Sequence, residues 1–151
     1  MATPNMDKFR LRRFVEKLYE LGEVETHEEQ INLSEIAAVI EDSPHVVWFK
    51  QVGPDKLELV ANVNGSRKRL AAAMDVSEDN IVEEFQRRLD DPQPVVNVGR
   101  DQAPVQQIVL EGDKADLTKL PFYVQHQFDG GAYLSSGIDY SIDPETGTTN
   151  V

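Results

Sequence analysis

Apolar residues recur at helical intervals near the beginning of the chain. Five of them fall at i, i+3, i+4, i+7 and i+10, and so share one face: Leu11, Phe14, Val15, Leu18 and Leu21. This spacing predicts an amphipathic helix over residues 7–21. Gly22 follows at the position where a left-handed residue often ends a helix.

A second, shorter helix is expected before Pro44. Asn32 or Ser34 is the candidate N-cap residue, and Glu35 lies close by, as in a capping box. The apolar residues that follow are Ile36, Ala37 and Ile40. Because proline lacks the backbone N–H that a helix needs, Pro44 ends this helix.

The next two apolar runs predict a pair of strands. VVWFKQVG, residues 46–53, is rich in β-branched and aromatic side chains. KLELVANVNG, residues 56–65, alternates apolar and polar positions, which directs one face toward a core. The Asn64–Gly65 step leads into SRKRLAAAM, so we interpret it as a strand-to-helix turn with Ser66 as N-cap.

Beyond a helix capped by Ser77, the pattern changes from helical to β-type. That helix carries Ile81, Val82, Phe85 and Leu89. Strands are then expected at 95–98, at 106–110 and at 132–142. We therefore predict an α+β fold: an N-terminal mixed α/β domain over 1–105, followed at 106–151 by a connection and the start of a second, mostly β domain.

The last predicted strand ends in a tight turn. Asp143-Pro144 with Gly147 suits a type I turn closed by a glycine at positive φ, and a return strand begins at Thr148. The hairpin would place Asn150 near Tyr140 or Ser141. The face that Asn150 occupies stays open, because a register shift of one residue reverses it.

Composition and charge exclude several classes of protein. The net charge of −12 argues against a nucleic-acid partner, and no apolar run is long enough to cross a membrane. The chain has no cysteine, which excludes disulfides, thiolate nucleophiles and cysteine-based zinc sites. We expect a soluble protein in the cytoplasm.

Composition and spacing alone name no reaction. Phosphate-binding loops, dinucleotide fingerprints, serine-hydrolase elbows and zinc-protease helices have no match in the chain. His27, His45 and His126 lie far apart, and none has metal-ligand spacing. Paired carboxylates such as Glu83-Glu84 and Asp90-Asp91 are typical of solvated helix surfaces.

Three segments together carry a family resemblance. LPFYVQHQFDGGAYLSSGIDYSIDPETGTTNV resembles the region of UbiD-type decarboxylases that contains DGG, a strand and then DPETG-x-x-N. NVNGSRKRLAAAMDV is similar to their N-x-x-GSR-x-R-x-A segment, and residues 6–40 are similar to their opening helices. The order of the three segments matches that of the family.

The resemblance implies an activity, cofactors and site residues. UbiD-type enzymes are reversible, non-oxidative carboxy-lyases that act on aromatic, heteroaromatic or α,β-unsaturated acids. They use prenylated FMN, held with a divalent ion, usually Mn2+, and often K+. Asn150 takes the position of a metal and cofactor ligand, Ser135 and the adjoining Ser136 take that of the substrate pocket, and His126 takes a structural position.

The resemblance also implies that the catalytic residues and the remaining metal ligands lie outside this chain. The family's catalytic Glu-Arg-Glu set and its remaining metal ligands, a histidine and a glutamate, follow the position of Asn150. We therefore expect no catalytic residue in this chain, an inactive fragment on its own, and a flavin-binding split β-barrel of which it holds the first hairpin. The full-length enzyme is expected to be a homo-oligomer.

Two alternatives remain at this stage. One is a non-catalytic or split-enzyme subunit that supports a separate catalytic chain. The other is a small acidic binding domain in which DPETG is only a common turn.

Overall fold

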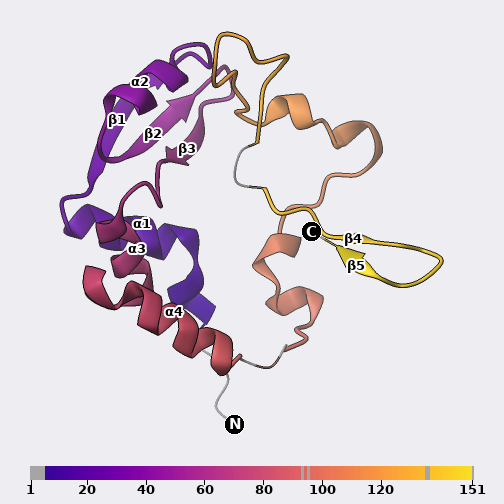
Figure 1. Ribbon diagram of the computed structural model, residues 1–151. Coiled ribbons are helices and arrows are strands. Elements are labelled where there is room, and N and C mark those ends of the chain that lie inside the picture. The colour runs from indigo at the N-terminus through magenta and orange to yellow at the C-terminus, as the bar shows by residue number, and fades with distance from the viewer. Residues whose placement is uncertain (1–5, 93, 95, 135–136, 151) are drawn as a thin grey trace.

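The fold is built on a three-stranded mixed sheet with α-helices around it (Figure 1). The computed structural model describes residues 6–92, 94, 96–134 and 137–150. β1 (Val24–Ile31) and β2 (Val46–Val52) are parallel, and α2 (Ile36–Asp42) connects them. β3 (Leu57–Ala61) pairs antiparallel with β2, as the alternating pattern predicts.

β1 is a strand that the sequence pattern does not predict. Its sequence, VETHEEQI, is mostly polar and lacks the apolar alternation of β3. It is nevertheless paired with β2 from Val24↔Val46 to Ile31↔Val52. β1 lies at the edge of the sheet, where charged side chains hinder further strand addition. Pairing with a strongly apolar neighbour thus overrides a weak local preference.

The first predicted helix is divided into two. A 3-10 turn at Met6–Phe9 precedes α1 (Leu11–Glu20), because the backbone of Arg10 between them is extended. Gly22 has φ +72°, which confirms the left-handed residue expected after the helix. Val15 and Leu18 are buried, whereas the ends of the apolar stripe are exposed.

α3 (Arg67–Met74) and α4 (Ile81–Asp90) join α1 below the sheet in Figure 1. Ser66 caps α3 as predicted, since its Oγ accepts a hydrogen bond from the Arg69 amide at 3.2 Å. A 3-10 turn separates Ser77 from α4, whose Ile81 is buried. The other apolar residues of α4 are exposed: Val82, Phe85 and Leu89.

The core lies between α2 and the sheet. Its buried cluster consists of Ile36, Val47, Phe49 and Val52. Among the described residues, every buried hydrophobic side chain lies between Val15 and Ile81. The packed part of the chain is therefore the N-terminal α/β unit.

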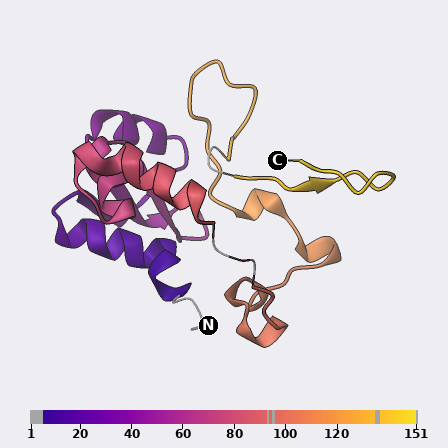
Figure 2. The same cartoon turned by 60° about the horizontal axis from the view of Figure 1, so that its bottom comes forward.

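The segment after α4 differs most from prediction. Described residues 96–98 and 106–110 form no strand, so those two strand predictions are wrong. Ile108 is 79% exposed, and among the described residues no strand lies beside it to pair with. A strand needs such a partner for its backbone groups, and β propensity alone does not supply one. Figures 1 and 2 both show this segment largely clear of the N-terminal unit.

The predicted C-terminal hairpin is present in shortened form. β4 (Ser141–Ile142) and β5 (Thr149–Asn150) pair antiparallel. Among the described residues of the strand expected over 132–142, pairing is found at its end and, by one isolated bridge, at Tyr133. The hairpin projects away from the rest of the chain in Figure 2.

Candidate functional site

Asn150, the predicted metal and cofactor ligand, lies on β5 opposite Ser141. This pairing confirms the predicted neighbour. The Ser141 hydroxyl donates a hydrogen bond of 3.4 Å to the Asn150 carbonyl. Asn150 is exposed, so its place in the hairpin presents it at the surface of the described chain.

The DPETG turn fixes this hairpin through the Asp143 carboxylate. Asp143 Oδ1 accepts a hydrogen bond from the Glu145 amide at 2.8 Å, and Oδ2 accepts one from the Thr146 hydroxyl at 2.8 Å. The Glu145 amide, followed by the Thr146 hydroxyl, lowers the pKa of Asp143. Gly147 has φ +70° and donates to the Asp143 carbonyl, which confirms the predicted glycine. The side chain of one aspartate therefore sets the register that places Asn150.

The predicted pocket residues Ser135 and Ser136 lie outside the described residues. The loop before them is ordered by a second aspartate, Asp129 of the DGG motif. Its Oδ2 accepts hydrogen bonds from the amides of Gln125 and His126, at 3.1 and 2.8 Å. The side chain of His126 is exposed. Sequence reasoning noted the motif without this role for its aspartate, which resembles that of Asp143.

Glu25, His27 and Ser43 form a polar cluster that sequence reasoning missed. The Glu25 carboxylate accepts a hydrogen bond from the Ser43 hydroxyl at 2.7 Å and lies 2.9 Å from His27 Nε2. The Ser43 hydroxyl, ahead of His27, lowers the pKa of Glu25. A hydrolase needs histidine between serine and carboxylate, so that the histidine takes the serine proton. Here the carboxylate is in the middle, and the cluster does not activate Ser43.

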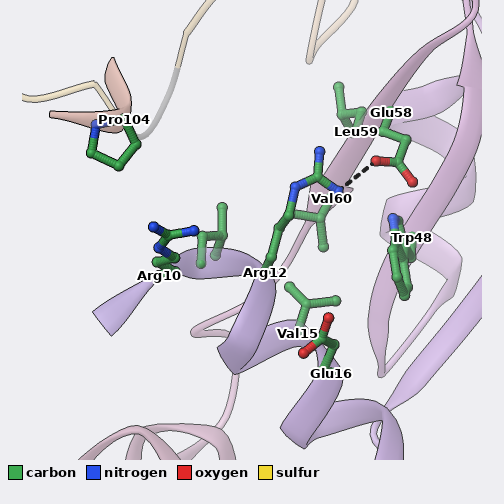
Figure 3. A pocket seen from close by; sticks show the side chains of 10 residues that line it. Arg10, Arg12, Val15, Glu16, Trp48, Glu58, Leu59, Val60 and Pro104 are labelled. Atoms are coloured by element: carbon green, nitrogen blue, oxygen red, sulfur yellow. Dashed lines mark hydrogen bonds and ion pairs between the residues drawn. The ribbon is translucent and has the colours of Figure 1, made fainter. Parts of the chain in front are cut away.

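A hollow of about 530 Å³ lies between α1 and β3 (Figure 3). Trp48, Leu59 and Val60 form its apolar side, and Pro104 borders it from the later segment. The charges at its rim are paired: Arg12 donates to Glu58 at 2.8 Å, and this contact is the main cause of the lowered pKa of Glu58. Asn150, the predicted site residue that the structure describes, does not line this hollow.

Metal binding by the described residues alone has little support. Nowhere in the described chain do three His, Cys, Asp or Glu side chains come together in a way that could hold an ion. An amide oxygen such as that of Asn150 is nevertheless a suitable ligand for a hard divalent cation. Of the predicted site residues, Asn150 is thus the one that the structure describes.

None of the helices in the described part of the chain is both long and apolar enough to span a membrane.

Two family domains match the chain, in sequence order. Residues 15–89 match the UbiD N-terminal domain, described as the 3-octaprenyl-4-hydroxybenzoate carboxy-lyase N-terminal domain. Residues 96–151 match the UbiD domain, described as the 3-octaprenyl-4-hydroxybenzoate carboxy-lyase Rift-related domain. The second match contains the hairpin and Asn150.

Two curated relatives are named as decarboxylases. The chain is 25% identical over 145 residues to the anhydromevalonate phosphate decarboxylase of Methanothermobacter thermautotrophicus, covering 93% of this chain and 32% of the relative. It is 29% identical over 147 residues to the phenolic acid decarboxylase of Sedimentibacter hydroxybenzoicus, covering 89% of this chain and 31% of the relative.

Solved structures share the fold. An evolved dimeric form of the UbiD-class enzyme HmfF from Pelotomaculum thermopropionicum, in complex with prenylated FMN, matches with a TM-score of 0.82 and 27% identity. That match covers 93% of this chain and 34% of HmfF. The closed form of the vanillic acid decarboxylase VdcCD of S. hydroxybenzoicus matches with a TM-score of 0.83 and 29% identity. This match covers 95% of this chain and 32% of the matching VdcCD chain. The chain spans about a third of the length of each relative.

Proposed function

Because this chain belongs to the UbiD family of carboxy-lyases, we propose that it is the N-terminal part of a reversible, non-oxidative decarboxylase. The proposed substrate is an aromatic, heteroaromatic or α,β-unsaturated carboxylic acid, and the proposed cofactor is prenylated FMN. One observation carries the proposal: the DPETG hairpin presents Asn150 within the part that matches the UbiD Rift-related domain. The division into residues 1–105 and 106–151 belongs to the same proposal.

Mn2+, often with K+, is the metal proposed beside the cofactor. Hard cations bind oxygen ligands, and the amide of Asn150 supplies one. In this proposal Asn150, exposed on β5, is one ligand of a site that other residues complete. The other ligands and the catalytic acid and base would come from polypeptide that follows or complements this chain.

The chemistry divides between cofactor and protein. Loss of CO2 from an sp2 carbon leaves an electron pair, and prenylated FMN, when bound, supplies the sink for it. In this proposal Asn150 helps to hold the metal, while Ser135 and Ser136 border the substrate. The hydrogen-bonded DPETG turn limits the motion of Asn150, so that less conformational freedom is lost on binding.

A split enzyme is the second candidate. In it, this chain would be a non-catalytic subunit that supports a separate catalytic chain. VdcCD, named with two components, shows that a relative is built from more than one polypeptide, and this chain covers 32% of its matching chain. A complete homo-oligomeric enzyme and a cytoplasmic location remain predictions.

Substitution of Asn150 in the complete enzyme tests the proposal. We expect Asn150→Ala to lower bound Mn2+, measured by mass spectrometry of the metal, by about tenfold or more, and to lower CO2 release with it. Asn150→Asp keeps an oxygen ligand and should retain most of the metal. Thr149→Ala is the matched control, because neighbouring residues of a strand face opposite sides. Full metal content and activity in Asn150→Ala would overturn the assignment.

A further inference from the structure

Tyr123 connects the later part of the chain to the N-terminal core. Its side chain packs against the buried cluster of Ile36, Val47, Phe49 and Val52. Among the described hydrophobic side chains after α4, it is the one that packs there. Burial raises the pKa of its hydroxyl, which agrees with a ring removed from water.

The backbone of Tyr123 closes the loop that contains the DGG motif. The Tyr133 amide donates a hydrogen bond of 3.1 Å to the Tyr123 carbonyl, in an isolated antiparallel bridge. Asp129 orders the interior of the same loop through the amides of Gln125 and His126. Tyr123 is therefore fixed to the core by its side chain and to Tyr133 by its main chain.

The surroundings of Tyr123 make this anchor distinctive. Several large apolar side chains of the later segment are largely exposed, such as Phe128 at 91% and Tyr140 at 80%. Beside Tyr123, a hollow of about 560 Å³ separates the loop from α2. The loop thus meets the N-terminal unit through a small contact, in which one ring reaches the core.

We propose that Tyr123 is a positioning residue, which fixes the DGG loop on the N-terminal core and so sets the starting point of the chain that leads to the DPETG hairpin. The importance of Tyr123 for decarboxylation rests on the proposed function, but the attachment of the DGG loop to the core by Tyr123 does not. The assignment explains why an aromatic side chain from a mostly exposed segment is inserted beside α2 and β2. Loss of the ring should release the loop while leaving the sheet intact.

Hydrogen exchange of the whole chain tests this assignment. In Tyr123→Ala, we expect amides of residues 122–134, including the Tyr133 amide, to exchange about tenfold faster or more, while those of β2 keep their protection. Tyr123→Phe keeps the ring and should restore slow exchange. Tyr140→Ala is the control for loss of an exposed tyrosine ring.

Each outcome decides the question. Unchanged exchange at Tyr133 in Tyr123→Ala would overturn the proposal. Loss of protection in β2 as well would also overturn it, because Tyr123 would then be an ordinary core residue. No decarboxylation is measured, so the result stands whether or not the chain serves a carboxy-lyase.

Discussion

Arg69 is the charged residue most deeply placed in the fold, at 2% exposure. Its Nη1 donates to the Pro44 carbonyl at 3.0 Å and lies 3.4 Å from Glu23 Oε2. Lys68 also contacts Glu23, and this hydrogen bond is the main cause of the lowered pKa of that carboxylate. Arg69 therefore ties α3 to the residues just before β1 and β2, where the helical group meets the sheet.

Removing this guanidinium should destabilise the N-terminal unit. We expect Arg69→Met to lower the free energy of unfolding by roughly 2–4 kcal/mol, because Glu23 and the Pro44 carbonyl lose a buried partner. Urea unfolding followed by fluorescence of the single tryptophan, Trp48 in β2, measures the change. The exposed Arg67→Met should cost less than about 1 kcal/mol. Equal effects of the two substitutions would contradict this role.

At the scale of elements, α4 combines an internal ion-pair network with an uncovered apolar face. Glu84 pairs with Arg87 and Arg88 at 2.7 Å each, and both arginines lie about one turn further along the same helix. The hydrogen bond from Arg87, followed by that from Arg88, lowers the pKa of Glu84 to about 2. Arg88 also donates to the Met74 carbonyl at 2.8 Å, which joins α4 to the end of α3.

The ion pairs of Glu84 make the stability of α4 depend on pH in the acid range. The folded pKa of Glu84 lies below its ordinary value of 4.5, so its stabilising contribution is complete above pH 4.5 and is lost as pH falls toward 2. A carbon-detected NMR titration should place the Glu84 midpoint near 2, and Arg87→Gln should move it upward. A midpoint near 4.5 in the unaltered chain would show that the pairs are not formed in solution.

The sequence pattern predicted the elements whose stabilising contacts come from residues nearby in the sequence. α3 with its Ser66 cap, the β2–β3 pair and the DPETG turn were all predictable. β1 was missed because its stability comes from pairing with β2, and the strand expected at 106–110 failed because no described strand pairs with it. The position of Asn150 followed from the turn, whereas the packing of Tyr123 depends on core residues far earlier in the chain.

At the scale of the whole molecule, the described chain has two unequal parts. The buried hydrophobic residues lie between Val15 and Ile81, while the later segment leaves large apolar side chains exposed, among them Ile108, Phe128 and Tyr140. Burial of apolar surface is the main driving force of folding, and exposed apolar groups of this kind are typical of surfaces that interact with other molecules. This agrees with the proposal that further polypeptide completes the cofactor site.

Release of CO2 is the measurement that tests this account most directly. The protein as its native source produces it, supplied with prenylated FMN and Mn2+, would be incubated with a panel of aromatic, heteroaromatic and α,β-unsaturated acids, beside the 151-residue chain under the same conditions. We predict flavin-dependent CO2 release by the native product and none by the 151-residue chain alone. Turnover by the isolated chain, or no CO2 from any acid with the loaded native product, would contradict the account.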